Sequence, residues 1–457
     1  MLSRTLISRL RQITGPEGII DGSEDLLIHS GDAVEAGAHT DVLVSPGTEE
    51  ETAAVLALAA GEGIPVVPRG SGTGPSLASV AREGEIVLSS ARMNQVHSVS
   101  AEDLIAVVGP GVKLEDLHRH ALAAGLLYPV HAAIDRPATL GGTIGESTNG
   151  LRAVKYGGTR NYVMGMRIAL PGGEVVQTGA RTLKCVTGYD LARLFTGSLG
   201  TLGVCTRIFL KLLPIQETNV VTVAIFDRAR EAAEASQRIL EDGIRPSILE
   251  LMDRTTLCAV AKTGNAPFPD DAGALLLIET DGLRVAADGQ AERAGAICHA
   301  SGAHQVRQAG TAHAVEAFMN ARRRAFAALA GTAPAIVLED VRVPRSKVAD
   351  LVGSLRALLE IEGVAMAVFG HVGEGRLHPA IPVDPGDSED VERARRIVEK
   401  ISGEVRSLGG QLGPERGVGL GPRVFLERRI APEKMEMARR LKETFDPVGI
   451  MNPRAVL

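Results

Sequence analysis

The sequence has few cysteines, no excess of positive charge and no long apolar run. Its 457 residues include four cysteines, and none of them belongs to a CxxC pair or a ferredoxin-type cluster. This spacing argues against a disulfide framework and against an iron–sulfur site in the chain, and it fits a reducing cytoplasm. The formal net charge of -6 argues against nucleic acid as the main partner, because binding phosphates needs a basic face.

No apolar run reaches the length that crosses a bilayer, so we expect no transmembrane segment. Residues 1–15 form a short amphipathic stretch with basic residues, without the apolar core and small-residue cleavage site of a secretory signal. A surface helix is the better interpretation of this stretch, and a transit peptide stays open as the alternative. We expect a cytoplasmic protein that reaches the inner membrane only through a partner.

Glycine, by contrast, is abundant, with 52 positions, which points to tight turns or to backbone that approaches a ligand closely. The first half alternates short apolar strands, helices and glycine loops, and the region after about residue 217 changes to longer strands and Ala/Glu/Arg-rich helices. The pattern predicts strands near residues 42–46, 64–68, 85–88, 104–108, 163–170, 174–177, 220–226, 274–279, 337–341 and 364–370, and helices near 48–61, 114–124, 229–241, 284–301, 346–360 and 432–445. We therefore expect an α+β chain whose second domain contains an antiparallel sheet.

Three glycine clusters lie next to apolar strands in the first half, at residues 69–74, 139–145 and 197–203. The first reads Arg-Gly-Ser-Gly-Thr-Gly and offers consecutive N–H groups without side-chain bulk, which suits a pyrophosphate. Taken alone, such a cluster is more often an ordinary turn. It is neither a dinucleotide fingerprint nor a P-loop, because the spacing of the former and the terminal lysine of the latter are missing.

The ordered set of motifs is more specific than any one loop. Residues 65–74 resemble the pyrophosphate loop of the vanillyl-alcohol-oxidase type of FAD-binding domain, and residues 139–144, 155–157, 183–190 and 197–203 resemble its later blocks in the same order. The tail at 445–453 is similar to the C-terminal signature of the group that holds the glycolate oxidase FAD subunit, D-lactate dehydrogenase and D-2-hydroxyglutarate dehydrogenase. The resemblance covers nearly the whole chain.

The resemblance implies an α+β fold in three parts. A PCMH-type FAD-binding domain with two subdomains is expected at 1–215, a substrate or cap domain at 216–410, and a C-terminal segment that returns to the flavin at 411–457. The FAD-binding residues expected on this basis are Pro68, Arg69, Gly70, Ser71, Gly72, Thr73, Gly74, Gly141, Gly142, Thr143, Gly150, Gly200, Gly203, Val204 and Asn452.

Two histidines and a carboxylate are candidate metal ligands. His371 and His378 flank a glycine loop after a strand, and Glu415 follows in a second glycine loop. Two imidazoles and one carboxylate suit Zn²⁺ or a similar divalent ion with open positions. From the residues alone, surface-turn histidines are the commoner interpretation. The resemblance favours a divalent metal (Zn, Mn or Fe) beside the flavin ring.

The implied reaction is oxidation of a small 2-hydroxy acid, with hydride transfer to FAD and metal activation of the hydroxyl. Arg322 lies where the group has an arginine for the substrate carboxylate, which a planar guanidinium can bind with two hydrogen bonds. Without the resemblance, the run Arg322-Arg323-Arg324 is better explained as a solvated helix face.

Departures from the group's pattern leave the catalytic chemistry open. Arg416 occupies the position of a histidine that is the group's general base, and arginine does not deprotonate usefully. Arg376 stands where the group has asparagine. Three explanations stay open. In the first, the enzyme uses another base, such as His131, or the metal alone. In the second, Arg376 and Arg416 clamp an additional acidic group of the substrate, and in the third, the chain is an FAD-carrying subunit with little activity of its own.

Because the chain has no iron–sulfur motif, we expect electrons to pass to a partner, such as an electron-transferring flavoprotein or an iron–sulfur subunit. A homo-oligomer stays open. A metal-dependent hydrolase built on His371, His378 and Glu415 would leave the three glycine loops unexplained.

Overall fold

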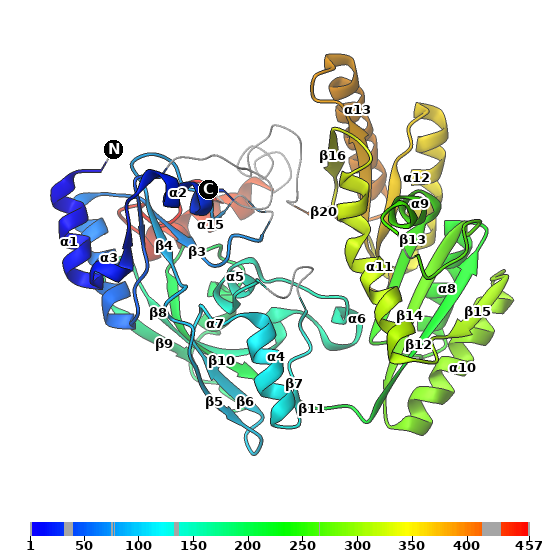
Figure 1. Cartoon of the computed structure of the whole chain (residues 1–457), viewed down its shortest axis with the longest axis horizontal. Coiled ribbons are helices and arrows are strands. Elements are labelled where there is room, and N and C mark those ends of the chain that lie inside the picture. Colours follow the sequence, from blue (N-terminus) through cyan, green and yellow to red (C-terminus); the bar gives the residue numbers. More distant parts are fainter. Residues whose placement is uncertain are drawn as a thin grey trace. The chain divides into compact units, whose positions relative to one another are not determined.

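The computed structural model describes residues 2–31, 40–74, 76, 78–131, 137–264, 266–413 and 431–455. The chain forms two compact units (Figure 1). The first unit consists of Met1–Gly150, Gly157–Ile215 and Leu420–Leu457, and the second of Leu151–Tyr156 and Gln216–Gly419. Within the described residues, no helix combines the length and hydrophobicity that crossing a membrane requires.

The first unit begins with helices around a small, mostly parallel sheet. Its helices are α1 (Arg4–Thr14), α2 (Ser23–Ser30) and α3 (Glu49–Glu62), and its strands are β1 (Ile19–Ile20), β2 (Val42–Val44), β3 (Val66–Arg69) and β4 (Ile86–Ser89), in the order β1-β2-β4-β3. Strand β4 is parallel to both β2 and β3. Helix α3 begins where the sequence predicts, because the Thr48 hydroxyl accepts from the N–H of Glu51 at 3.1 Å.

A second, antiparallel sheet completes the first unit. Its order is β5 (Val96–Ser100), β6 (Ile105–Val108), β10 (Val204–Lys211), β8 (Val163–Ala169) and β9 (Val175–Gly179). Helices α4 (Leu114–Ala123), α5 (Leu140–Glu146) and α7 (Leu191–Phe195) and the strand pair β7 (Leu126–Leu127) and β11 (Leu213–Pro214) belong to the same unit. The expected glycine loop at 139–145 is therefore largely helical, and Gly141 packs so closely that an added Cβ would lie 2.9 Å from the Cβ of Pro110.

The end of the chain returns to the first unit. Helix α15 (Pro432–Phe445) is followed by a segment that runs parallel to β3. The N–H of Val66 donates to the carbonyl of Ile450, and the N–H of Asn452 donates to the carbonyl of Val66, both at 2.8 Å. These bonds join residues nearly 400 positions apart in the sequence.

The second unit is built on one large sheet with helices on both faces. In the described part of the chain its strands follow the order β15 (Gln305–Gln308), β12 (Thr218–Phe226), β14 (Ala274–Gly282), β13 (Ile248–Asp253), β18 (Ala367–His371), β19 (Arg376–Val383), β17 (Val341–Arg342) and β20 (Gln411–Leu412), with β16 (Ala335–Leu338) also paired to β19. All of the strand pairs are antiparallel. The helices are α6 (Ala153–Tyr156), α8 (Ala229–Glu241), α9 (Arg254–Lys262), α10 (Arg284–Ala300), α11 (Ala312–Ala330), α12 (Val348–Glu362) and α13 (Ser388–Ser407).

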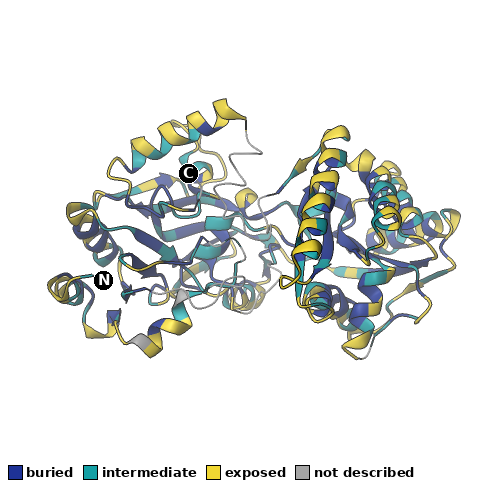
Figure 2. Ribbon diagram, turned by 90° about the horizontal axis from the view of Figure 1, so that it is seen from above, coloured by how far each residue is buried: buried dark blue, intermediate teal, exposed yellow. Residues whose placement is uncertain are grey.

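Side-chain alternation assigns each helix to a face of this sheet. Val223 and Ile225 of β12 join a core with α9 and α11, whereas Ala224 and Phe226 join a core with α8, α10, α12 and α13. The strands are buried, and exposed residues lie on the helices that cover them (Figure 2). The observed mixture of helices and sheets confirms the expected α+β class.

Segment 151–156 belongs to the second unit although residues on both sides of it belong to the first. Arg152 pairs with the buried carboxylate of Glu279 at 3.0 Å. Lys155 pairs with Asp281, and the Tyr156 hydroxyl donates to the other oxygen of that carboxylate at 2.5 Å. These polar contacts explain why the short helix α6 groups with the sheet of the second unit.

The expected strand at 337–341 is interrupted. Strands β16 and β17 are separated by Glu339 and Asp340, whose side chains are fully buried. The Asp340 carboxylate and carbonyl are occupied by contacts from Arg376, Arg342 and the N–H of Gly413. The sequence pattern also did not predict several other elements of the second unit, which are the helices α6, α9, α11 and α13 and the strands β13, β15, β19 and β20.

Candidate functional site

Three glycine-containing segments and the C-terminal segment converge at the end of β3 in the first unit. A Cβ on Gly70 would lie 2.3 Å from the Thr139 hydroxyl, so the first loop lies directly against the start of α5. The third loop contacts both, because the N–H of Leu199 donates to the carbonyl of Gly145 at 2.9 Å and a Cβ on Gly200 would lie 2.7 Å from the Pro68 ring. Segments far apart in the sequence thus meet at one place in the first unit.

The first loop presents unused backbone donors. The N–H groups of Ser71, Gly72, Thr73 and Gly74 donate to no other described residue, and all four residues are only partly buried. Gly72 has a φ of 68°, which lets successive N–H groups point to one side. The Thr139 hydroxyl is buried without a hydrogen-bond partner in the described part of the chain. These donors fit the pyrophosphate of a dinucleotide.

Arg69 shapes this loop. Its side chain is buried, and its guanidinium donates to the carbonyls of Gly31 at 2.6 Å and Ser79 at 3.3 Å. A Cβ on Gly72 would lie 2.1 Å from this guanidinium. Arg69, which the sequence assigns to cofactor binding, therefore braces the loop from within.

The other expected FAD-binding residues lie at several places in the first unit. Pro68 ends the buried part of β3, Gly141, Gly142 and Thr143 lie in α5, and Gly203 and Val204 lead into β10. The side-chain amide of Asn452 donates to the carbonyls of Ala78 and Leu199, each at 2.8 Å. Gly150 packs against the backbone of His131, because an added Cβ on Gly150 would lie 2.1 Å from the carbonyl oxygen of His131. Gly150 is also the last residue of the first segment of the first unit.

In the second unit, strand register places the polar candidates in one row. Leu251 pairs with Gly370, so Glu250 on β13 lies next to His371 on β18. His371 pairs in turn with Arg376 on β19, and Phe369 pairs with His378. Because side chains alternate along a strand, these residues share the sheet face that α11 covers.

Glu250 joins a histidine to an arginine. One carboxylate oxygen accepts from Nδ1 of His371 at 2.6 Å, and the other accepts from Nε of Arg322 on α11 at 2.7 Å. Burial by itself would raise the pKa of Glu250, but His371 and Arg322 outweigh burial and hold the pKa below its usual value. With Nδ1 donating, the neutral His371 ring keeps the lone pair of Nε2 for a ligand.

Asp340 occupies the equivalent place behind the second histidine. Its Oδ1 accepts from Nε of Arg376 at 2.5 Å and lies 3.7 Å from Nδ1 of His378, and its Oδ2 accepts from Arg342 at 2.8 Å. The rings of His371 and His378 are 5.4 Å apart and nearly perpendicular. His371 is thus hydrogen-bonded to a buried carboxylate, whereas the carboxylate near His378 lies beyond hydrogen-bond distance. Each of the two carboxylates also binds an arginine.

The backbone of β18 allows the two histidines to approach. Gly370 has a φ of 149°, and a Cβ there would lie 2.7 Å from the carbonyl of Arg376 and 3.3 Å from the His378 ring. Glu374 follows in a short 3-10 turn, where burial raises the pKa of its carboxyl. Its Oε1 is buried and has no hydrogen-bond partner among the described residues.

The structure brings together some of the expected catalytic residues. Arg322 is buried whereas Arg323 is exposed, so Arg322 is not part of a solvated helix face. His131 lies in the first unit, where its ring is 4.3 Å from that of His118. Glu415 and Arg416 lie outside the described residues. Within the described part of the chain, no three His, Cys, Asp or Glu side chains form a complete metal site.

Sequence reasoning missed Glu250 and Asp340. A signal was present for Glu250, which is the charged member of the otherwise apolar run Ile248-Leu249-Glu250-Leu251-Met252. Acidic residues are rarely buried unless they are paired, so a carboxylate in such a strand indicates a nearby cation. Its partners lie 72 and 121 positions away, which the sequence pattern does not show.

The two units, with their donor-lined loop and paired histidines, are those of a two-domain flavoprotein, and known families agree. Residues 40–179 match the family described as "FAD binding domain", and residues 215–456 match "FAD linked oxidases, C-terminal domain". The chain belongs to this family of FAD-linked oxidases. It is an FAD-dependent oxidoreductase.

Curated relatives match over almost their whole length. A glycolate oxidase subunit GlcD of Bacillus subtilis is 35% identical over 99% of this chain and 97% of the relative. A D-lactate dehydrogenase of Anaerostipes hadrus is 30% identical over 98% of this chain and 96% of the relative. The fold is also that of p-cresol methylhydroxylase, with a TM-score of 0.78 and 17% identity over 99% of this chain and 96% of that structure.

Proposed function

We propose that this enzyme oxidises a small 2-hydroxy acid to the 2-oxo acid. The reaction removes a hydride from Cα and a proton from the hydroxyl. The names of the relatives support this substrate class, since they include glycolate oxidase and D-lactate dehydrogenase. The observation that carries the proposal is the pair of neighbouring histidines, with buried carboxylates 2.6 Å from His371 and 3.7 Å from His378, next to a buried arginine.

We assign the flavin to the place in the first unit where the glycine segments meet. FAD, when bound, supplies the acceptor of the hydride. In this assignment the N–H groups of residues 71–74 bind the pyrophosphate, and the Thr139 hydroxyl gains a partner. The surrounding contacts come from Pro68, Gly70, Gly141, Gly142, Thr143, Gly150, Gly200, Gly203, Val204 and Asn452, while Arg69 holds the loop in shape. The corresponding domains are 1–215, 216–410 and 411–457.

Arg322 is the proposed substrate clamp. Its Nε is used by Glu250, which leaves the two terminal Nη groups to bind the substrate carboxylate. Its guanidinium also lies 5.1 Å from the centre of the Phe369 ring, which limits its rotation. Arg376 is half-buried nearby in the same row and would favour an anionic substrate, as would Arg416 if it joins the site.

His371, His378 and Glu415 are the proposed holders of a divalent metal. The donor set of two imidazoles and a carboxylate suits such an ion, and buried carboxylates behind metal-binding histidines are common. A Lewis acid at this position lowers the pKa of the substrate hydroxyl. The reaction then still needs a base that accepts the hydroxyl proton. His131 is our candidate for this base, because Arg416 occupies the position where the family has a histidine.

Anaerobic flavin reduction tests this function. The purified yellow protein is mixed with glycolate, lactate, malate and 2-hydroxyglutarate, each with and without a chelator. At least one acid should bleach the flavin absorbance, and Arg322→Gln should raise the KM for that acid much more than Arg323→Gln does. If none of these acids bleaches the flavin, this substrate class is wrong.

A second candidate follows from Arg416 and from the word "subunit" in the relative's name. In this alternative the chain carries FAD in a larger redox complex and has weak activity alone. Its electrons pass to an electron-transferring flavoprotein or an iron–sulfur subunit. Yellow protein that is bleached only after a partner is added supports this candidate.

A further inference from the structure

A cavity of about 580 Å³ opens in the second unit. It lies where strand β18 begins, beside Met366, whereas His371 ends the same strand. At a rise of about 3.3 Å per residue, these two positions are about 16 Å apart along the strand. Neither histidine lines the cavity, although its lining residue Ala380 is two positions from His378 on β19. The volume of the cavity is in the range of small-ligand sites.

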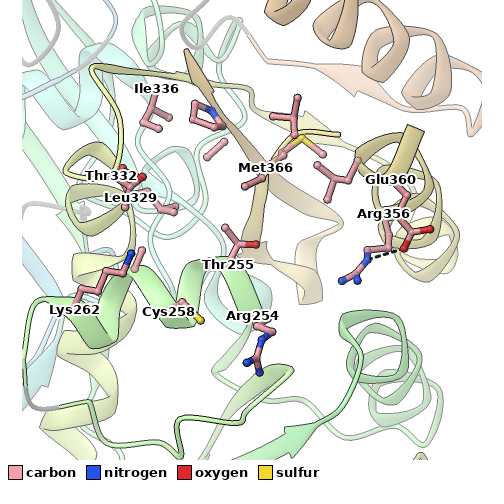
Figure 3. Close-up of a pocket in the computed structure, with 16 residues that line it drawn as sticks. Arg254, Thr255, Cys258, Lys262, Leu329, Thr332, Ile336, Arg356, Glu360 and Met366 are labelled. Atoms are coloured by element: carbon pink, nitrogen blue, oxygen red, sulfur yellow. Dashed lines mark hydrogen bonds and ion pairs between the residues drawn. The ribbon is translucent and has the colours of Figure 1, made fainter. Parts of the chain in front are cut away.

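The floor of this cavity is apolar. Its accessible apolar area comes from the partly buried side chains of Ile336, Leu359, Val364 and Pro382, whereas Leu329, Met366 and Ala380 are almost fully buried (Figure 3). Helix α9 forms one wall and the end of α12 forms the other. These two helices cover opposite faces of the sheet, so the cavity opens where the sheet ends between them. A hydrocarbon chain fits such a surface because it removes apolar area from water.

The rim of the cavity is basic. Arg254, Lys262 and Arg356 supply positive charge, and Glu360 is the one acidic lining residue. Arg356 and Glu360 are 3.3 Å apart and both largely exposed, so their pair is weak. Lys262 has no hydrogen-bond or ion-pair partner in the described part of the chain. Two positive charges are thus left uncompensated beside an apolar floor.

We propose that this cavity binds an amphiphilic monocarboxylate, with its aliphatic chain on the floor and its carboxylate at Lys262. The positive charge at the rim favours an anion. The volume of the cavity favours an aliphatic chain longer than that of the small hydroxy acids proposed as substrates. Arg254, Cys258 and Lys262 are spaced at four-residue intervals and share one face of α9. The exposed thiol of Cys258 therefore reports on occupancy.

Octanoate is the probe, used with the FAD-loaded protein. In a Cys185→Ser background, Cys258 is the one remaining exposed cysteine, since Cys205 is partly buried and Cys298 is buried. Octanoate should bind in titration calorimetry and slow the maleimide labelling of Cys258 at least fivefold. Butyrate, which has the charge with a short chain, and octanol, which has the chain without the charge, should each bind at least tenfold more weakly.

Charge reversal at the rim provides the second test. Lys262→Glu should weaken octanoate binding at least tenfold, whereas Lys434→Glu on α15, an exposed lysine of the other unit, should not change it. The flavin spectrum and the melting temperature report on folding of each variant. Equal binding of octanol, unprotected Cys258 or full affinity in Lys262→Glu would overturn the proposal. None of these readouts involves flavin reduction, so they are independent of the proposed function.

Discussion

Glu250 is held between an imidazole and a guanidinium in the interior of the second unit. Its carboxylate is 1% exposed and binds both His371 and Arg322. A buried ion pair contributes little net stability, but removing one partner leaves the other charge buried and uncompensated. The same bonds fix the ring orientation of His371 and the direction of Arg322, so Glu250 is a positioning residue for both.

Glu250→Gln should therefore lower the free energy of unfolding by about 3 kcal/mol, because Arg322 loses its counter-charge. Urea denaturation of the FAD-loaded protein measures this loss. The matched control is Glu316→Gln on the same helix as Arg322. The side chains of Glu316 and Arg323 are 59% and 39% exposed, so breaking their pair should cost less than about 1 kcal/mol.

The same carboxylate predicts a pH dependence. His371 and Arg322 depress the pKa of Glu250 in the folded state against the opposing effect of burial. A depressed carboxyl pKa stabilises the fold above the pKa of the unfolded chain, about 4.3, and this contribution is lost as the pH falls through the folded value. The stability difference between wild type and Glu250→Gln should thus be constant near neutral pH and shrink in acid. A difference that grows in acid would contradict this assignment.

Several residues of the candidate site could be named from the sequence, because their side chains have a distinctive chemistry. His371 and His378 were named from their motif and Arg322 from the family resemblance, and the structure places them within one strand row and the helix above it. Glu250 and Asp340 were not, because their roles depend on pairing between strands distant in the sequence. Arg69 shows a related limit, since a motif names the residue but not whether it faces the ligand or the protein.

Strand β18 and its turn form the element that brings the histidines together. Gly370→Ala should destabilise the second unit by about 2 kcal/mol, because its φ of 149° and the Arg376 carbonyl 2.7 Å away both exclude a Cβ. Gly289→Ala, inside α10 with nothing within 4 Å, should instead stabilise by up to about 1 kcal/mol. Urea unfolding of both variants tests the opposite signs.

Periodicity predicted several long elements, but it missed the 19-residue helix α11 and the 20-residue helix α13, and it misjudged glycine-rich segments. Helix α3 begins at its predicted cap, and the apolar run of β14 is a central strand. Gly141 and Gly142 were interpreted as loop, yet they lie in α5, where glycine is needed for close packing against Pro110. Helix propensity disfavours glycine, and tertiary contact overrides that preference here.

At the scale of the whole molecule, the chain closes its first unit with its last residues. Asn452 has a φ of 42° and holds the carbonyls of Ala78 and Leu199. Asn452→Gly keeps this backbone conformation but removes both bonds, and we expect a loss of about 2 kcal/mol because two carbonyls lose their donor. FAD retention in gel filtration should fall as well. Asn452→Ala, which adds backbone strain, should lose more stability than Asn452→Gly. If Asn452→Gly has the stability and FAD retention of the wild type, these hydrogen bonds contribute to neither.

The division into two units predicts that flavin binding and metal binding can be separated. The loop donors assigned to FAD are all in the first unit, and His371 and His378 are both in the second. A chelator, or His378→Ala, should abolish flavin reduction by the substrate acid while leaving the FAD content unchanged. Adding Zn²⁺ or Mn²⁺ should restore flavin reduction in the chelated wild type but not in His378→Ala, because one ligand is missing.

The matched control is His304→Ala, which changes a half-exposed histidine near β15. The flavin of this variant should be reduced by the substrate acid as in the wild type. Full activity in metal-free protein would limit the two histidines to binding substrate directly, whereas loss of FAD from His378→Ala would show that the two units do not bind their ligands independently.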